Sequence, residues 1–385
     1  MASSRARVRD AIIVGAGPAG SVLGYELARA GADVVVLEKE RIPRYKACGG
    51  GVNLRAARLL DFDISPVTER VVYGVEVTYK LGQGFVKRCP EPLTFMVMRD
   101  RFDCFLAERA VATGAAVLDG RKVTRIEEAN RHLLVRCGEE AFQGLLIVGA
   151  DGASSVVARH LGLMREAGLS VALEAEVDVP SSALARWDSL VTIDIGVIPG
   201  GYAWVFPKAD HLSIGVVGDV RHVHRLRQYY RRFLQAQHLG PYQVRRFRGH
   251  RMPMRYPGMD IQQGPGLLLG DAAGLIDPFS GDGIYYAIRS AQIAAPVVLK
   301  ALESGAMGLG EYQMAVDREL MPERRVAATM LRLFNWVPGL YFQWIKHHQL
   351  PWKAACKILR GDKAYTSVPQ RLGPKWILFD LVRRM

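Results

Sequence analysis

A glycine-rich turn near the start of the chain has the residue types and the spacing that hold a pyrophosphate. Three glycines follow the pattern G-x-G-x-x-G, and they are Gly15, Gly17 and Gly20. The first permits a tight turn, the second lets the backbone approach the anion, and the third allows a helix to pack closely on a strand. Pro18 and Ala19 would open that helix, whose N-terminus carries free N–H groups and a positive dipole end. Glu38, at the end of the following strand, is placed to accept hydrogen bonds from a ribose, so the segment predicts dinucleotide binding.

Two further glycine–aspartate turns indicate which dinucleotide is bound. One contains Asp151 and follows a buried strand, and the other contains Asp271, 120 residues later. A nicotinamide dehydrogenase needs neither turn. FAD is longer, so one turn can lie along it while the Asp271 carboxylate binds its ribityl hydroxyls. A helix that begins near Gly283 and Ile284 can point its N-terminus at the flavin, where negative charge gathers on reduction. The three turns together predict FAD.

Around these turns the chain alternates strand and helix patterns, as expected of an α/β body. The predicted strands are 11–14, 34–37, 115–119, 131–137, 145–148 and 266–269, and the predicted helices are 18–30, 100–113 and 282–304. Strand-like alternation with few helical periods fills 170–250, which predicts an inserted antiparallel sheet. We therefore expect a Rossmann-like FAD-binding domain with an inserted antiparallel-sheet substrate domain and a C-terminal helical region. The expected boundaries are 1–75, 95–165 and 258–305 for the first, 76–94 and 166–257 for the second, and 306–385 for the third.

The composition is that of a globular protein with a large core, because 49% of the 385 residues are hydrophobic and 23% are charged. A net charge of +13 favours an anionic lipid surface or a diphosphate-bearing substrate. Nucleic acid is disfavoured, since Lys and Arg are spread along the chain without a recognition motif. Five scattered cysteines without a C-x-x-C pair predict neither a disulfide framework nor a metal site. The first apolar run is too short for a signal peptide, so we expect a cytoplasmic protein, and a monomer.

The C-terminal part of the chain raises the question of a membrane. No run of about 18 uninterrupted apolar residues predicts a spanning helix. The nearest approach, 327–345, is interrupted by a proline and several polar residues, but it is rich in aromatic residues and is followed by Lys346, His347 and His348. This pattern predicts either a helix pair that rests on the inner face of a membrane or a helical hairpin packed on the body.

Further motifs give the chain a family resemblance. The three turns resemble the flavoprotein superfamily that includes the aromatic hydroxylases. Within it, the segment 43–51 (PRYKACGGG) is similar to the K-x-C-G-G turn of the geranylgeranyl reductase family, and 201–208 (GYAWVFPK) is similar to its Y-x-W-x-F-P signature. The segments 98–103 and 271–286 also fit, and the resemblance covers about residues 10–300. It departs after Pro207, where the usual G-x-G is replaced by the longer Gly215-Val-Val-Gly218.

The resemblance implies roles for individual residues. Cys48 would face the flavin ring as a substrate-facing thiol that tunes hydride or proton delivery, although a small buried thiol in a turn is also often structural. The other residues that the resemblance would place at the cofactor are Lys46, Ala47, Gly49, Arg99 and Val123. Tyr202, Trp204 and Phe206 alternate along a strand, so they share one face and would form an aromatic wall for a polyprenyl chain. Alternating aromatics can equally be sheet core.

The resemblance implies an FAD-dependent reductase that saturates C=C bonds of a geranylgeranyl chain carried on a diphosphate, pigment, lipid or quinone. NADPH or reduced ferredoxin would be the electron donor. Two alternatives stay open: an aromatic monooxygenase or halogenase of the same superfamily, and a prenyl-binding protein without catalysis. Halogenases carry W-x-W-x-I-P where this chain has Y-A-W-V-F-P.

Overall fold

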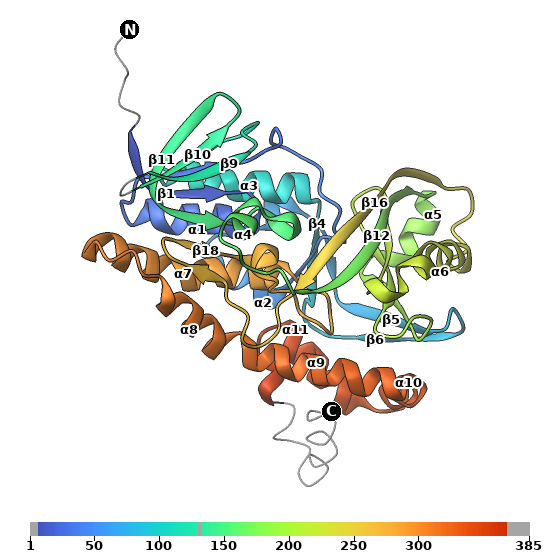
Figure 1. The fold of residues 1–385 in the computed structure, drawn as a ribbon. Helices are drawn as coiled ribbons and strands as arrows, with labels where there is room; N and C mark the ends of the chain where they lie inside the picture. Colours follow the sequence, from blue (N-terminus) through green and yellow to red (C-terminus); the bar gives the residue numbers. More distant parts are fainter. Residues whose placement is uncertain (1–6, 130–131, 368–385) are drawn as a thin grey trace.

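A computed structural model describes residues 7–129 and 132–367 of the chain. Its first layer is an eight-stranded sheet (Figure 1). The main path of this sheet is β17 (Gln262–Gln263), β18 (Gly266–Leu268), β11 (Glu140–Gly149), β1 (Val8–Val14), β2 (Val34–Leu37) and β8 (Ala116–Leu118). The strands from β18 to β8 are parallel, and β9 (Arg125–Ala129) with β10 (His132–Cys137) adds an antiparallel hairpin to β11. Parallel strands are covered on both faces, which is why β1 and β2 are apolar runs.

Helices from distant parts of the sequence cover this sheet. The longer ones are α1 (Pro18–Arg29), α3 (Arg99–Ala112) and α7 (Ile284–Ser304), and the short ones are α2 (Leu54–Ala57) and α4 (Val156–His160). The helix α1 packs against both α3 and α7, so the first phosphate turn and the Asp271 turn are held on neighbouring elements. A small sheet of β3 (Gly51–Asn53), β7 (Thr94–Val97) and β4 (Thr68–Val72) joins this body to the second lobe.

The second lobe is a seven-stranded sheet. Its order is β16 (Gln243–Met254), β12 (Gly168–Asp178), β15 (Leu212–Asp219), β14 (Tyr202–Pro207), β13 (Leu190–Ile195), β5 (Gly74–Tyr79) and β6 (Gly84–Arg88). All neighbours are antiparallel except β13 and β5. One face packs a separate core against α6 (Val223–Ala236), and α5 (Ser181–Leu184) lies nearby (Figure 1). The opposite face carries the predicted aromatic wall.

The C-terminal helices run along one side of both lobes (Figure 1). They are α8 (Gly310–Glu319), α9 (Met321–Trp336), α10 (Pro338–His347) and α11 (Gln349–Leu359). Phe342 of α10 packs on Tyr79 and Phe85, which lie on β5 and β6. In the part of the chain that the structure describes, no helix combines the length and the apolar composition that crossing a membrane requires.

The expected α/β fold class is confirmed, and the inserted region contains one long helix that the sequence did not locate. Strands dominate 170–250 as expected, and the main helix among them, α6, is a regular helix of 14 residues. Its buried side chains, Leu226, Tyr229, Tyr230, Phe233 and Leu234, follow the i, i+3, i+4, i+7, i+8 pattern, while arginines occupy the other face. The strongly alternating strands on either side obscured this single helical period.

Candidate functional site

A continuous cavity of about 1460 Å³ lies where the two large sheets and the C-terminal helices meet. Ligand pockets are typically about 300–1,000 Å³, so the volume suits more than one ligand. Every residue that the sequence analysis assigned to a cofactor or a substrate lines this cavity, with Gly20 as the exception. These lining residues are Gly15, Gly17, Pro18, Ala19, Glu38, Lys46, Ala47, Cys48, Gly49, Arg99, Val123, Tyr202, Trp204, Phe206, Asp271, Gly283 and Ile284.

One end of the cavity has the features of an anion site. Gly17 is the N-cap of α1, and no side chain caps the helix, so the first N–H groups of α1 are free to bind an anion. A Cβ built on Gly17 would meet only the guanidinium groups of Arg44 and Arg99, at 3.9 and 4.0 Å. Gly15 has φ +100°, and a Cβ there would lie 2.4 Å from the Ala150 carbonyl oxygen, so only glycine suits the turn.

Gly20 has the close-packing role that the glycine pattern predicts, although it was also counted among the cofactor-binding residues. It does not line the cavity. A Cβ on Gly20 would lie 1.9 Å from the carbonyl oxygen of Gly15. Gly20 therefore allows α1 to approach the turn closely, and it acts on any ligand only through the shape of that turn.

Glu38 holds the same turn in place. Its Oε2 accepts a hydrogen bond from the Ala16 backbone N–H at 3.0 Å, and its Oε1 accepts one from the Glu40 backbone N–H at 3.1 Å. Arg44 lies 3.2 Å from the Glu38 carboxylate and also donates to Asp103. Each carboxylate oxygen has two lone pairs, so Glu38 retains acceptor capacity toward the cavity.

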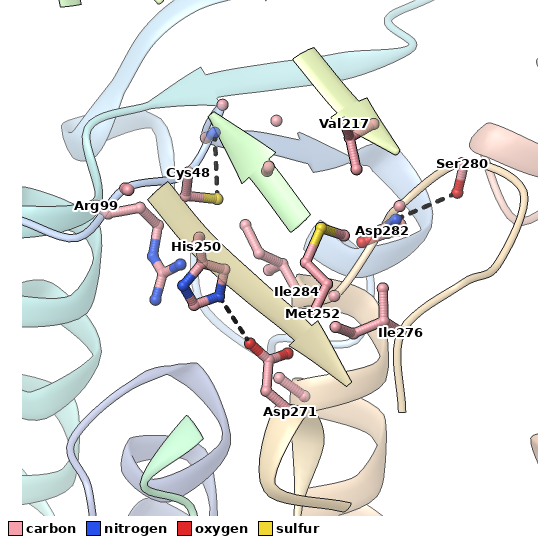
Figure 2. Close-up of a pocket in the computed structure, with 18 of the residues that line it drawn as sticks. Cys48, Arg99, Val217, His250, Met252, Asp271, Ile276, Ser280, Asp282 and Ile284 are labelled. Carbon is pink, nitrogen blue, oxygen red and sulfur yellow. Dashed lines mark hydrogen bonds and ion pairs between the residues drawn. The ribbon is translucent and has the colours of Figure 1, made fainter. Parts of the chain in front are cut away.

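Asp271 lies at the start of the third turn beside two basic side chains. Lys46 Nζ is 3.8 Å from Asp271 Oδ2, and His250 Nε2 is 3.3 Å from the same oxygen. Figure 2 shows His250 with Cys48 and Arg99 on one side and Asp271 on the other. Burial by itself would raise the pKa of Asp271, but Lys46 and His250 outweigh it and lower the pKa to about 2. Burial and the nearby Lys46 lower the pKa of His250, so its imidazole is neutral at pH 7.

Cys48 lines the cavity near Arg99 and His250 (Figure 2). Its Sγ accepts a hydrogen bond from the Gly50 backbone N–H at 3.4 Å. Arg99 is buried, donates two hydrogen bonds to Asp103 at 2.7 and 2.8 Å, and interacts with the Cys48 thiol. The turn that carries Cys48 is tied to the second lobe by Lys208, whose Nζ donates to the Gly49 carbonyl oxygen at 2.8 Å.

The aromatic wall is formed as predicted from the alternation on β14. The ring centroids of Tyr202 and Trp204 are 6.0 Å apart, and those of Trp204 and Phe206 are also 6.0 Å apart. A Cβ on Gly49 would lie 2.7 Å from the Phe206 ring, so the cysteine-bearing turn lies directly against the wall. Tyr202 donates a hydrogen bond from its hydroxyl to the Ser280 carbonyl oxygen at 2.7 Å, which fixes the ring at the start of the turn before α7.

Beyond the wall the cavity continues as an apolar arm between the seven-stranded sheet and the helices α9 to α11. The sheet contributes Val75, Val77, Val191, Ile193 and Ile195. The helices contribute Met330, Leu331, Phe334, Tyr341, Trp344, Ile345, Ala354, Ala355, Ile358 and Leu359. These side chains offer almost no hydrogen-bonding groups, so the arm suits a long hydrocarbon.

Comparisons with known proteins agree with this geometry. The FAD binding domain family matches residues 9–193. The geranylgeranyl diphosphate reductase of Rhodobacter capsulatus is 32% identical over 315 residues, which are 77% of this chain and 76% of that protein. The chain belongs to the geranylgeranyl reductase family of FAD-dependent oxidoreductases. An uncharacterized protein of Methanosarcina barkeri is 31% identical over 93% of both chains.

Solved structures show the same fold. A geranylgeranyl bacteriochlorophyll reductase-like protein from Thermoplasma acidophilum superposes with a TM-score of 0.76 at 23% identity, and covers 97% of this chain and 95% of its own. A flavin-dependent brominase superposes almost as well, with a TM-score of 0.74 at 20% identity over 98% of both chains. The fold alone therefore does not separate reductases from halogenases.

The residues present fit the FAD that the geranylgeranyl reductase family uses. The uncapped N-terminus of α1, with Arg44 and Arg99 beside it, suits the pyrophosphate. Asp151 lines the same part of the cavity, and its buried Oδ1 has no hydrogen-bond partner among the described residues. A bound polar ligand would satisfy that oxygen. At the other turn, Gly283 is the N-cap of α7 and lines the cavity, while the Asp282 carboxylate accepts a hydrogen bond from the Tyr285 backbone N–H at 3.2 Å, so part of this helix N-terminus is already capped.

Several groups in the site were missed in the sequence. His250 was not selected from the sequence, yet it lines the cavity and contacts Asp271. Glu174 and Arg44 also line it. Arg44 lies in the 43–51 segment but was given no role there, whereas His250 and Glu174 lie in no recognisable motif. Glu174 has one usable signal, because a glutamate alternates with apolar residues on a strand whose two faces are both buried.

Proposed function

We propose that the protein uses reduced FAD to saturate C=C bonds of a geranylgeranyl-type chain carried on a diphosphate, pigment, lipid or quinone. The observation that carries the proposal is the continuity of the cavity. The phosphate turn and Cys48 line it at one end, and the apolar arm between the sheet and α9 to α11 extends from it. A C20 isoprenoid has apolar area and double bonds but no hydrogen-bonding groups along its chain, and it needs such an arm.

The proposed substrate makes particular demands on the protein. An isolated alkene accepts hydride poorly because no carbonyl withdraws its electrons. Reduced FAD, when bound, supplies the hydride. The residues of the chain must hold the double bond still and exclude water, and such positioning can contribute up to about 7–11 kcal/mol. In the proposal Trp204 and Phe206 grip the prenyl chain, and Cys48 contacts the reacting bond from the adjoining turn.

Two neighbours support this role for Cys48. The Gly50 N–H donates to its sulfur, and Arg99, which is itself fixed by Asp103, interacts with the thiol. The Gly49 position, in contact with Phe206, keeps the sulfur close to the aromatic wall. A thiol in this setting can touch an alkene that lies on the wall and can help to direct a proton to it.

We also propose that the protein works in the cytoplasm and contacts the inner face of a membrane through its C-terminal helices. Its five cysteines are all free thiols, which is typical of a reducing compartment. Trp336, Leu340 and Leu350 are each between 67% and 70% exposed, and they lie on the same helices that line the apolar arm. Exposed Lys346 is close by in sequence and suits anionic lipid.

Vesicle binding tests the membrane contact. Leu340→Glu with Leu350→Glu should reduce co-sedimentation with vesicles of phosphatidylcholine and phosphatidylglycerol. Met314→Glu is the matched control, because Met314 is 64% exposed but lies on α8. Equal co-sedimentation of the three proteins would disprove contact through these helices.

Mass spectrometry tests the reaction. The purified protein, reduced with dithionite under argon, is incubated with geranylgeranyl diphosphate, geranylgeranylated chlorophyll, an unsaturated ether lipid and menaquinone. Mass gains in steps of two hydrogens on one of them would support the proposal and identify the substrate. A colourless protein would favour a prenyl-binding role. Oxygen uptake with NADPH and an aromatic substrate, without alkene reduction, would favour a monooxygenase or halogenase. Comparing NADPH with reduced ferredoxin then identifies the donor.

A further inference from the structure

A carboxyl group outside every sequence motif is buried in the cavity wall beside Cys48. Glu174 of β12 is 2% exposed and lines the cavity. It lies two residues from Ala172, which packs against Trp204, so its side chain is on the same face of the sheet as the aromatic wall. Its Oε1 has no hydrogen-bond partner among the described residues. A buried polar atom of this kind needs a partner, and the cavity is where one can come from.

A buried lysine lies close to this carboxyl group. Lys208 is 0% exposed, and its Nζ donates to the carbonyl oxygens of Gly49 and Val97, both at 2.8 Å. Lys208 also interacts electrostatically with Glu176 and with Glu174, which are two positions apart on β12. Two buried carboxyl groups thus share one lysine, and charge balance favours a proton on one of them.

A hydrogen-bonded path leads from Glu176, the neighbour of Glu174 on the same face of β12, to solvent. His211 Nε2 lies 2.9 Å from Glu176 Oε2, and His211 Nδ1 lies 2.6 Å from Asp210 Oδ1. The His211 ring is buried, whereas the Asp210 side chain is 66% exposed. An imidazole with both nitrogens engaged can take a proton at one nitrogen and release one at the other. Asp210, His211, Glu176 and Glu174 therefore form a row of proton-carrying groups from surface to cavity.

We propose that Glu174 donates the proton for alkene reduction and that Glu176, His211 and Asp210 form the path that returns a proton to it from solvent. This inference rests on the proposed function. In the step, the π bond breaks and two C–H bonds form. One alkene carbon receives hydride, with its electron pair, from the reduced flavin, and the other receives H⁺ from the Glu174 carboxyl group. Glu174 is left as a carboxylate, and one solvent proton per double bond restores it.

The electrostatics of the site agree with this role. Burial, followed by the neighbouring Glu176, raises the pKa of Glu174 to about 8, against the opposing effects of Lys208 and the Cys48 backbone N–H. Tyr45 and Arg248 line the cavity with it, Arg248 on the paired strand β16, and Tyr230 of α6 interacts with it electrostatically from the other side of the sheet. Glu174 therefore keeps its proton at neutral pH and loses it as the pH rises through about 8.

The proton itself can be observed without turnover. In FAD-loaded protein with ¹³C at the glutamate Cδ, one carboxyl resonance should titrate near pH 8, and it should be absent from Glu174→Gln. Glu323→Gln is the matched control. Glu323 of α9 is a carboxyl group whose pKa is also raised by burial, but it does not line the cavity. Loss of the resonance in Glu323→Gln only, or no glutamate that titrates above pH 6, would overturn the proposal.

Kinetics then test the path. With pre-reduced enzyme and geranylgeranyl diphosphate, Glu174→Gln should retain FAD and slow the first turnover by about a hundredfold or more. His211→Gln should keep the first turnover and lose rate only in repeated turnovers. A Glu174→Gln variant with the wild-type rate and pH profile would refute the donor role. If the wild-type protein reduces no prenyl chain, the proposed function fails. The carboxyl titration then decides by itself whether Glu174 carries a proton at neutral pH.

Discussion

Replacing Gly215 by alanine should push the indole ring of Trp204, the middle residue of the aromatic wall, away from the sheet. Gly215 of β15 is paired with Trp204 of β14. A Cβ built on it would lie 2.2 Å from Trp204 Cζ2 and 2.5 Å from Cη2. Carbon atoms in contact are about 3.5 Å apart or more, so the indole would have to move by about 1 Å. Tyr202 and Phe206 flank the ring, so it can move only toward the cavity that it lines.

The expected loss of stability in Gly215→Ala follows from overpacking. Forcing one extra carbon into a filled site typically costs about 1–3 kcal/mol, and we expect the free energy of unfolding to fall by that amount in Gly215→Ala. Urea titration measures it. Gly218→Ala is the matched control on the same strand, because its Cβ would meet only Ile198 and Leu226 side-chain carbons at 3.3 Å, on the opposite face. Aliphatic side chains can shift by a few tenths of an ångström, so this control should cost less.

A double-mutant cycle tests whether the destabilisation by Gly215→Ala comes from its contact with Trp204 or from another cause. Trp204→Ala removes the ring atoms that Gly215→Ala would strike. In that background the alanine at Gly215 should cost little, which gives a coupling energy of about 1 kcal/mol or more. Gly215→Ala alone should also raise the KM for geranylgeranyl diphosphate, because the displaced indole enters the cavity. Equal destabilisation by Gly215→Ala in the presence and in the absence of Trp204 would refute this account.

Three further substitutions test the turns. Gly20→Ala should yield protein that elutes from gel filtration without flavin absorbance, since its Cβ would lie 1.9 Å from the Gly15 carbonyl oxygen; a yellow variant would contradict this. Cys48→Ala should keep its FAD but slow prenyl reduction by about tenfold or more, and full activity in an FAD-replete variant would exclude the assigned role. The folded protein lowers the pKa of Asp271 from its ordinary 3.8 to about 2. The Asp271 carboxylate therefore contributes its full stabilisation at pH values above 3.8, and this contribution is lost as the pH falls through 2. Asp271→Asn, which leaves Lys46 without its carboxylate, should therefore lower the free energy of unfolding by about 2 kcal/mol at pH 7 and by less at pH 3, and an equal loss at both would argue against this origin.

The sequence by itself determined the parts whose signal is local. The turn around Gly15, the carboxylate at Glu38 and the alternation of Tyr202, Trp204 and Phe206 each depend on residues a few positions apart, and backbone geometry makes their consequences readable. The α/β fold class followed from the periodicity of long segments. The departure from the family pattern at Gly215 was also visible in the sequence, but the sequence did not show that Gly215 lies against the Trp204 ring.

Only the tertiary structure decided which distant side chains meet in the cavity. Strand order places β16 beside β12, and this is what brings His250 and Glu174 to the same wall, although neither has a local motif. Lys208 reaches the backbone of Gly49 across 159 positions of sequence. The composition of the apolar arm depends in the same way on α9 to α11 closing over β5 and β13. Such contacts depend on how sheets and helices pack, and no spacing along the chain encodes that packing.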